Sequence, residues 1–599
     1  MSQSAGLVGE VARVAGPVVT AIGLDGIRLH DVVLVGEIGL VGEVIRLSGP
    51  STVVQVYEDT SGIRVGEVVR STGMPLVVQL GPGLLGRVYD GLQRPLPDLA
   101  GMTGNFIRRG VSASPLPKDH RWAFSPHVCE GDAVGPGDAL GTVVESKTIE
   151  HRIMVPPSLQ GRVVEIREGD FRIDERVAVL EMEGDRKKGH REITLVQQWP
   201  VRRPRPFSDR LPPCEPLVTG TRIIDAFFPV ARGGAAIIPG GFGTGKTVAE
   251  HTLARWADAD VVVYVGCGER GNEMTEVLEE FPTLEDPRTG APLMNRTVLI
   301  ANTSNMPVAA REASIYTGVT IAEYYRDMGY DVLMLADSTS RWGEALREIS
   351  GRLEEMPGEE GYPAYLAARL SEFYERSGRV VCQGRGQDTG SGQARIGSLT
   401  IVGAVSPPGG DFSEPMTQNS MRVAGTFWAL DYDLSRRRHF PSINWIRSYS
   451  LYDVRNWYVS AVGGEWAELT REAMALLQRE VELLEIVQLV GPEALAESER
   501  AVLAVARMMR EDYLQQSAYH EVDRYCPMEK AYRMLRCIMG FHRLTQEAVA
   551  SGVALERVTA LPIIGEIGRM KYLLPEQAAV EIEAVEARLR PSFLELRGP

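Results

Sequence analysis

The clearest chemistry in this sequence lies in one glycine-rich run that ends in lysine and threonine. Gly240-Gly241-Phe242-Gly243-Thr244-Gly245-Lys246-Thr247 fits G-x-x-x-x-G-K-[ST], the loop that binds phosphate in nucleoside triphosphatases. Its glycines permit backbone angles that let successive N–H groups point at one anion. The Lys246 ammonium can reach the terminal phosphates, and the Thr247 hydroxyl can ligate a phosphate-bound Mg²⁺ ion. The run therefore predicts a site for a nucleoside triphosphate with Mg²⁺.

The segments on either side of the loop favour this interpretation over a chance match in a glycine-rich turn. Residues 234–238 are small and apolar, which is typical of a short buried strand. Residues 247–256 have helical composition, so a phosphate in the loop would lie at a helix N-terminus, where unpaired N–H groups attract it. Strand, loop and helix in this order are the expected setting of the motif.

A second element is the apolar run of residues 332–336, which ends in Asp337. In open α/β sheets, ligands bind beside the carboxyl ends of the strands. An acid there can hold Mg²⁺ through water, with Thr247 as the other protein ligand. The alternative is an aspartate that caps the following helix. The phosphate-binding loop nearby in the sequence favours the metal role for Asp337.

The third element is Glu269, which follows the apolar run 261–265 with Arg270 directly after it. One helix and one strand separate the loop from Glu269, so we expect this acid at the same sheet edge as the phosphates. A carboxylate there can orient the water that attacks the γ-phosphorus, and Arg270 can neutralise charge that develops on the phosphate oxygens. Glu273 is a competing candidate, and either acid alone is more often a solvated loop residue. Glu269 is preferred because it comes first after the strand.

Composition limits the class of protein. The chain has 599 residues and a net charge of −15, so it is a poor candidate for coating nucleic acid or anionic lipid, and we expect no nucleic-acid partner. Its six cysteines lack C-x-x-C spacing, which argues against a zinc site and a disulfide framework. There is no basic-then-apolar leader and no apolar run near the ~18 residues of a spanning helix. We therefore expect a cytoplasmic protein that reaches a membrane only through partner subunits.

The patterning predicts a multidomain fold. Short alternating apolar runs with glycine turns are typical of a small β-barrel. Strands that alternate with longer helices predict a parallel sheet covered on both faces, and the last part of the chain has helical periods only. The expected order is an N-terminal β-barrel (1–72), an inserted β-sandwich bulge (110–190), a central α/β RecA-like P-loop domain (195–445) and a C-terminal helical domain (450–599).

The insert has two interpretations. Glu130-Gly131-Asp132 recurs as Glu168-Gly169-Asp170, each before a valine-rich run, as in a sandwich of two similar hairpin units. The segment around Lys147 resembles a lipoyl or biotinyl carrier domain, in which Lys147 would carry a swinging arm. A β-sandwich that serves only as a structural bulge is preferred, because likeness of fold does not carry function. A lipoyl or biotinyl adduct on Lys147, seen by intact mass, would overturn that preference.

Together these motifs resemble the catalytic A subunit of vacuolar/archaeal-type rotary ATPases, over essentially the whole chain. The insert matches the bulge that distinguishes this family from F-type β chains. Besides the phosphate-binding loop, the motifs that carry the resemblance are residues 268–274, 337–342, 361–366, 412–415 and 438–445.

The resemblance implies a ring in which three A chains alternate with three B-type chains around a central stalk, with a peripheral stalk. Such a ring couples ATP hydrolysis or synthesis to proton or sodium movement through a membrane sector. By position, Glu269 corresponds to the family's catalytic carboxylate and Arg270 to its phosphate-contacting arginine. Phe440 and Tyr519 would enclose the adenine of ATP or ADP. The family's arginine finger comes from the B-type partner and raises turnover about 10³–10⁵-fold, so the chain alone is expected to be a poor ATPase.

Two alternatives stay open at this point. A non-catalytic nucleotide-binding member of the ring would be expected to lack Lys246 or Glu269, and both are present. Another hexameric motor is the second alternative. A nucleic-acid translocase is disfavoured by the acidic charge, and an export ATPase is not expected to carry the insert. Gel filtration separates these cases, because a stable self-hexamer favours the other motor and a mixed ring favours the rotary ATPase.

We predict that mild oxidants do not inhibit this chain. Many eukaryotic relatives carry a cysteine at the position of Thr244, where the resemblance implies pairing with a second cysteine that corresponds to Cys526. Threonine cannot form that disulfide. Activity should therefore be unchanged after peroxide treatment, measured with and without dithiothreitol. Inhibition by peroxide that dithiothreitol reverses would contradict the prediction.

Overall fold

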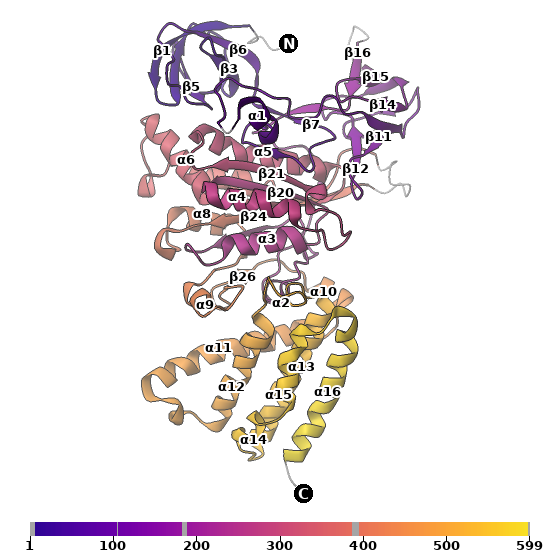
Figure 1. The fold of residues 1–599 in the computed structure, drawn as a ribbon, viewed down its shortest axis with the longest axis vertical. Helices are drawn as coiled ribbons and strands as arrows, with labels where there is room; N and C mark the ends of the chain where they lie inside the picture. The colour runs from indigo at the N-terminus through magenta and orange to yellow at the C-terminus, as the bar shows by residue number, and fades with distance from the viewer. Residues whose placement is uncertain (1–5, 105, 183–188, 386–393, 597–599) are drawn as a thin grey trace. The chain divides into compact units, whose positions relative to one another are not determined.

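The computed structural model describes residues 6–104, 106–182, 189–385 and 394–596 (Figure 1). The chain divides into two compact units, which are described separately. Unit 1 contains Met1–Pro212, Ala259–Pro407 and Asp411–Val423, and unit 2 contains Pro213–Asp258, Pro408–Gly410 and Ala424–Pro599. No helix among the described residues is long and apolar enough to cross a membrane.

Unit 1 begins with a closed six-stranded barrel. Its strand order is β1-β2-β5-β4-β3-β6, all antiparallel. The interior is filled by small branched side chains that alternate along the strands, among them Val11, Val19, Val33, Val44 and Val54. The strands are β1 (Val8–Ala15), β2 (Val18–Ile22), β3 (Asp31–Val35), β4 (Leu40–Ser48), β5 (Ser51–Val56) and β6 (Val68–Pro75).

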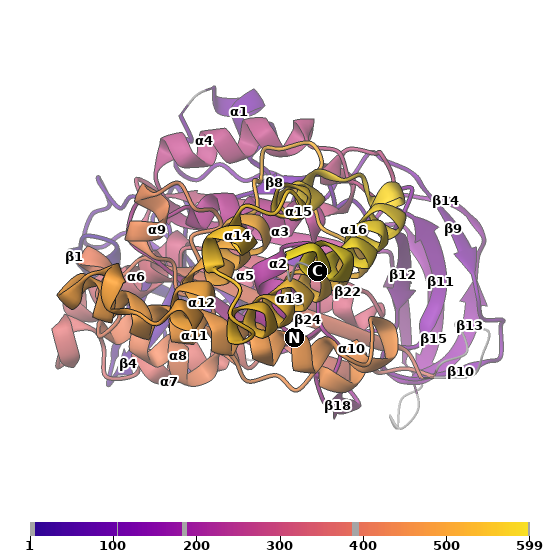
Figure 2. The ribbon, with the colours of Figure 1, turned by 90° about the horizontal axis from the view of Figure 1, so that it is seen from below.

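The insert is a sandwich of two four-stranded sheets, as Figure 2 shows at its right side. One sheet has the order β10-β13-β15-β16 and the other β12-β11-β9-β14. The two copies of the Glu-Gly-Asp repeat lie beside β10 in one sheet and in β14 of the other. The strands are β9 (Trp122–Pro126), β10 (Ala133–Val134), β11 (Ala139–Val144), β12 (Glu150–Met154), β13 (Gly161–Ile166), β14 (Gly169–Phe171), β15 (Arg176–Met182) and β16 (His190–Thr194).

The largest sheet of unit 1 is parallel in its central strands and runs β24-β22-β20-β21-β8. Its strands read as continuous apolar runs because both faces are covered. The strands are β8 (Val88–Tyr89), β20 (Val261–Glu269), β21 (Thr297–Thr303), β22 (Asp331–Asp337) and β24 (Ile396–Val405). At one end, β23 (Gly378–Val381) pairs antiparallel with β24 and with β18 (Asp209–Leu211). Elsewhere in the unit, β7 (Val77–Leu80) pairs with β17 (Gln197–Pro200).

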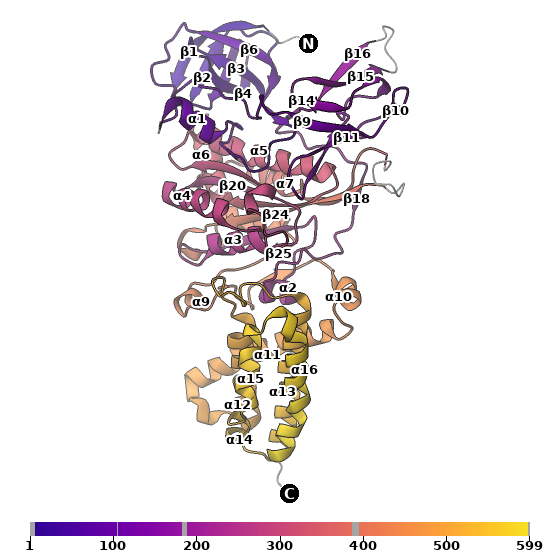
Figure 3. The same cartoon turned by 45° about the vertical axis from the view of Figure 1, so that its right-hand side comes forward.

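Helix α5 (Val308–Asp327) lies at the centre of unit 1 (Figure 3). Every residue after Val308 is buried, because the helix packs against the sheet and also against the segments around Gly91 and Val201. The other helices of unit 1 are α1 (Leu96–Thr103), α4 (Gly271–Glu280), α6 (Thr339–Arg352), α7 (Leu366–Tyr374) and α8 (Pro415–Val423).

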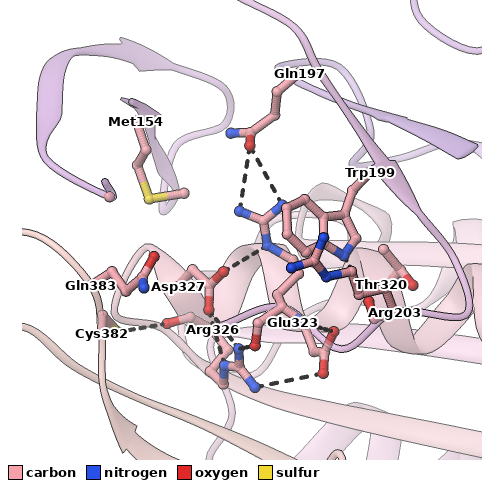
Figure 4. Close-up of polar contacts among 12 residues, drawn as sticks. Met154, Gln197, Trp199, Arg203, Thr320, Glu323, Arg326, Asp327, Cys382 and Gln383 are labelled. Atoms are coloured by element: carbon pink, nitrogen blue, oxygen red, sulfur yellow. Dashed lines mark hydrogen bonds and ion pairs between the residues drawn. The ribbon is translucent and has the colours of Figure 1, made fainter. Parts of the chain in front are cut away.

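A buried ion network anchors the C-terminal turn of α5 (Figure 4). Asp327 accepts from Arg205 Nε at 2.6 Å and from Arg326 Nη2 at 2.7 Å. Glu323 pairs with Arg376 at 2.5 Å. Arg205 also lies over the Trp199 ring, 5.0 Å from its centroid. The segment that leaves the insert is therefore fixed to α5 by charge as well as by packing.

A second buried network joins the barrel to α5. Arg202 donates to both oxygens of Glu43 on β4, at 2.7 and 2.9 Å, and to both oxygens of Glu312 on α5, at 2.9 and 2.7 Å. Glu43 also receives hydrogen bonds from His30 and Tyr57. Burial alone would raise the pKa of the Glu43 carboxyl, but Arg202 and these hydrogen bonds lower it to about 2.

Unit 2 combines a small sheet with the C-terminal helices. The sheet has the order β26-β25-β19, from β19 (Ala235–Pro239), β25 (Thr426–Phe427) and β26 (Tyr449–Ser450). Helix α13 buries an apolar stripe against α11, α12 and α16. The helices are α2 (Arg222–Phe227), α3 (Lys246–Trp256), α9 (Tyr432–Arg436), α10 (Arg455–Ala461), α11 (Trp466–Val490), α12 (Glu497–Met508), α13 (Met528–Ala550), α14 (Leu555–Thr559), α15 (Ile563–Arg569) and α16 (Pro575–Leu596).

The predicted domain 195–445 does not coincide with one compact unit, because residues 213–258 group with the C-terminal helices. Buried polar contacts explain this grouping. Arg222 pairs with Asp523 at 2.7 Å, and the Gln516 amide accepts from the Arg222 N–H and donates to the Gly220 carbonyl, each at 2.8 Å. These contacts span almost 300 residues of sequence, so no local pattern reveals them.

We expect Arg202→Met to destabilise unit 1. The change leaves Glu43 and Glu312 buried without their shared cation, which costs about 3–5 kcal/mol and lowers Tm by on the order of 10 °C. The lowered pKa of Glu43 means that its stabilising contribution is present above pH 4.5 and is lost as the pH falls towards 2. The Tm difference between wild type and variant, measured by calorimetry, should therefore be largest near neutral pH and shrink on acidification.

Arg46→Met is the matched control, because Arg46 is an exposed residue on the same strand as Glu43. It should leave Tm within about 1 °C of wild type, in keeping with surface substitutions. A loss in Arg202→Met that does not depend on pH would contradict the electrostatic explanation.

Candidate functional site

The glycine-rich loop of unit 2 joins β19 to α3. Gly243 and Gly245 have φ of +77° and +90°, in the left-handed region that favours glycine, and Gly245 directly precedes the first residue of α3. Gly240 has no room for a side chain, since a Cβ there would lie 2.5 Å from Thr244 Oγ1 and 2.8 Å from Leu430 Cβ. The loop therefore brings backbone N–H groups to the N-terminus of α3, where an anion binds favourably.

Hydrogen bonds fix the shape of the loop. The Thr244 hydroxyl donates to the Gly241 carbonyl at 2.8 Å, and the Ser442 hydroxyl donates to the Thr244 carbonyl at 2.6 Å. The Lys246 ammonium donates to the carbonyls of Gly240 and Gly241 at 2.7 and 3.0 Å. The lysine thus lies across the mouth of the loop, within reach of phosphates bound there. Thr247 is the second residue of α3, and Phe242 is largely exposed at the loop tip.

An apolar pocket continues from the loop along α3. Its lining includes Gly245 of the loop, Thr252 of α3, Phe440, Gln516 and Arg524. Phe440 lies 3.5 Å from the position that a Cβ on Gly245 would occupy, so one aromatic wall stands directly beside the loop. The pocket has the character of a base-binding site, with an aromatic ring on one side and few polar groups.

Tyr519, the other residue expected against the base, does not line this pocket. The residue is 84 % exposed, and the lining includes its neighbour Ala518 instead. Tyr519 was chosen because it is aromatic. The sequence alone does not show which of two adjacent residues faces the pocket.

Unit 1 brings the predicted acids together at the carboxyl ends of two neighbouring strands. β20 and β22 are parallel, with Gly266 opposite Asp337, so Glu269 extends three residues beyond that pair. Asp337 is buried and accepts a hydrogen bond from the Tyr264 hydroxyl at 3.2 Å. Glu273 lies in the first turn of α4, shortly after Glu269. Glu269 is the last residue of β20, so this strand extends four residues beyond the predicted run 261–265.

Glu269 is held in an environment that opposes its charge. Burial raises the pKa of its carboxyl most, and the carboxylates of Asp337 and Glu273 raise it further, to about 8. At neutral pH the nucleotide-free protein therefore keeps Glu269 mainly protonated. A cation near Asp337 would relieve this repulsion and favour the carboxylate, which is the form that can orient water.

A bulge in β20 lies directly before Glu269. The pairing of β20 with β21 shifts between Cys267 and Glu269, where Gly268 has φ +73°. A Cβ on Gly268 would lie 2.8 Å from Arg311 Cδ and 2.8 Å from Arg341 Cβ. Two arginine side chains therefore close over this glycine, directly next to the candidate catalytic acid.

These two arginines were not singled out from the sequence. Arg341 pairs with Glu344 at 2.8 Å, and Arg311 donates to the Ser304 carbonyl at 2.8 Å, while the Ser304 N–H donates to the Glu269 carbonyl at 2.9 Å. The sequence did contain a signal that could have identified them, because each arginine lies in the first turn of the helix that follows β21 or β22. Such turns lie at the ligand-binding edge of a parallel sheet.

The remaining candidates have clear positions. Arg270 is exposed at the N-terminus of α4, beside Glu269. Lys147 is exposed in the turn between β11 and β12. Thr244 and Cys526 are both buried in unit 2, and burial raises the pKa of the Cys526 thiol.

The proposed Mg²⁺ ligands are a hydroxyl in unit 2 and a carboxylate in unit 1. Oxygen donors of this kind suit a hard ion that keeps several waters and takes its other ligands from phosphate, so the donor set fits Mg²⁺. Among the described residues, no group of three or more His, Cys, Asp or Glu side chains could hold a metal by itself. Thr247 of unit 2 and Asp337 of unit 1 therefore stay predicted ligands of Mg²⁺.

Comparison with known families confirms the fold class. The nucleotide-binding domain model of the ATP synthase alpha/beta family matches residues 220–450. The beta-barrel domain of that family matches residues 11–73, and its barrel-sandwich domain matches residues 113–202. The C-terminal domain of V and A type ATP synthase matches residues 455–559.

Curated relatives are similar over nearly the whole chain. The A subunit of the A-type ATP synthase of Methanopyrus kandleri is 58 % identical over 98 % of this chain and 98 % of that protein. The proteins of the same name from Thermococcus sibiricus and Methanococcus vannielii are 59 % and 56 % identical, over 98 % and 97 % of this chain and 99 % and 97 % of their own lengths.

We expect Glu269→Gln to stabilise the nucleotide-free chain in a pH-dependent way. Because the pKa of Glu269 is raised to about 8, its stability contribution is fully present below about pH 4.5 and is lost as the pH rises towards 8. Glutamine has no proton to lose. The Tm advantage of the variant should grow by on the order of 5 °C between pH 5 and pH 8, measured by calorimetry.

Glu276→Gln, at an exposed position on α4, is the control and should show no such growth. A Tm advantage of Glu269→Gln that is equal at both pH values would show that Glu269 is not protonated in the folded chain.

Proposed function

Because this chain belongs to the family formed by the A subunits of A-type ATP synthases, we propose that it catalyses ATP hydrolysis and synthesis in a rotary complex. The resemblance drawn from its motifs is confirmed by full-length relatives. The single observation that carries the proposal is the acid cluster of Glu269, Asp337 and Glu273, since a chain that only held nucleotide would have no use for a buried carboxyl of raised pKa.

In this proposal, unit 2 binds the nucleotide. The loop from Gly240 to Thr247 receives the phosphates of ATP or ADP through its N–H groups and the Lys246 ammonium. The pocket along α3 receives the base, with Phe440 as its aromatic wall. The many hydrogen bonds that already fix the loop mean that little reorganisation is needed when phosphate binds.

Unit 1 supplies the chemistry. Glu269, once ionised, accepts a hydrogen bond from the attacking water and orients it towards the γ-phosphorus. Arg270 and Arg341 neutralise charge on the phosphate oxygens as it develops. Thr247 and, through water, Asp337 would hold Mg²⁺, which would supply positive charge against the phosphates. The same groups stabilise the same transition state in the direction of synthesis.

The proposal includes partner chains. A B-type partner would supply an arginine finger in an alternating ring of three A and three B chains, and central and peripheral stalks would link the ring to a membrane sector that moves protons or sodium ions. The chain itself would lie on the cytoplasmic side. The acidic charge of −15 supports a protein partner rather than nucleic acid.

Glu269→Gln should abolish turnover in the assembled complex while nucleotide binding persists. Glutamine keeps the size of the side chain but cannot act as a base, so we expect a loss of about 10²–10⁴ in kcat. Phosphate release and MgADP affinity are measured on the same preparation. Glu276→Gln serves as the control and should retain wild-type turnover. Turnover of Glu269→Gln within a few-fold of wild type would exclude Glu269 as the group that orients water.

A further inference from the structure

Arg524 is a cation in the base pocket, and no described residue gives it an anionic partner. Its guanidinium lies over the Trp256 ring, 5.4 Å from the centroid, and the residue lines the pocket. Its Nε is buried without an acceptor, and within the part of the chain that the structure describes its guanidinium forms no hydrogen bond or ion pair. Burying such a donor is unfavourable unless something else accepts from it.

The position of Arg524 along α3 points to the base of a bound nucleotide. Gly245 and Thr252 line the same pocket, and they are separated by about 10 Å of helix at 1.5 Å per residue. Trp256 follows Thr252 by one further turn, so Arg524 stands at the end of the pocket remote from the phosphate loop. A nucleotide with its phosphates on that loop presents the edge of its base there.

Three of the other polar side chains that line the pocket are already engaged. The Gln516 amide bonds the Arg222 N–H and the Gly220 carbonyl, and the Thr252 hydroxyl donates to the Val248 carbonyl at 2.8 Å. The Ser442 hydroxyl donates to Thr244. Thr221 also lines the pocket and has one hydroxyl, whereas the Arg524 guanidinium has five donors and no acceptor, so Arg524 offers most of the donors that remain for a ligand.

We propose that Arg524 reads the edge of the nucleotide base and lets the pocket accept 6-oxopurine nucleotides as well as adenine nucleotides. A 6-oxopurine, such as guanine or hypoxanthine, presents O6 and N7 side by side, and both accept from one guanidinium. Adenine presents N7 next to the N6 amino group, which is a donor, so it offers Arg524 a single acceptor at that edge. This inference rests on the proposed function, because it takes the pocket as the base site.

The test measures binding of MgADP, MgGDP and MgIDP to the full-length chain by calorimetry. The wild type should bind all three within about tenfold of one another. Arg524→Met keeps the stem over Trp256 and removes the donors, so it should weaken GDP and IDP about 5- to 100-fold more than ADP. Arg524→Lys, a point charge without the planar fork, should recover only part of the loss. In the assembled complex, the ratio of kcat/KM for GTP to that for ATP should fall in parallel.

Arg255→Met is the matched control. The Arg255 guanidinium also lies over the Trp256 ring, at 5.0 Å, but Arg255 does not line the pocket. It should leave the GDP-to-ADP affinity ratio unchanged. Equal weakening of all three nucleotides by Arg524→Met, no change in the ratio, or rejection of GDP and IDP by the wild type would each overturn the inference. Failure of the wild type to bind MgADP would instead contradict the proposed function itself.

Discussion

The structure depends most on the enforced closeness of carboxyl groups at the ends of β20 and β22. Parallel pairing leaves Glu269 and Asp337 at one edge of the sheet, and burial removes the water that would screen them. Burial and the repulsion between these groups raise the pKa of Glu269 to about 8, so the folded chain favours its protonated form at neutral pH. A cation near Asp337 would offset this repulsion and favour the carboxylate form of Glu269. The arginines that close over Gly268 are placed where they can stabilise the same charge.

The nucleotide loop is tied to the helical part of unit 2 by a few buried polar groups. Gln516 lines the base pocket and also bonds the backbone of Gly220 and Arg222, while Arg222 pairs with Asp523. The pocket is thus assembled from segments of unit 2 that lie far apart in the sequence. Breaking one of these groups leaves others buried without partners, which is costly. The phosphate loop and the C-terminal helices of unit 2 therefore fold cooperatively.

Much of this was predictable from local sequence. The loop, Asp337 and Glu269 follow short motifs, and buried parallel strands read as continuous apolar runs, so strands and acids were found within a few residues. The helical period did not locate the ends of individual helices: α12 begins only at Glu497, after Gly491 with φ +88° and a short turn. Arg311, Arg524 and the grouping of residues 213–258 with the C-terminal helices depend on contacts between distant segments. The choice of Ala518 over Tyr519 depends on the direction of a single side chain, which periodicity does not encode.

Helix α5 has a mechanical consequence. It is about 30 Å long at 1.5 Å per residue, and its two ends are held by different parts of unit 1. Asp327 and Glu323 at one end are clamped to the segment that leaves the insert, and Arg311 at the other end holds Ser304, whose N–H is bonded to the Glu269 carbonyl. Because α5 is almost fully buried, it is a rigid connection between these two ends. The insert and the backbone of Glu269 are therefore linked through a single rigid element, since one end of α5 contacts the segment that leaves the insert and the other contacts Ser304 beside Glu269.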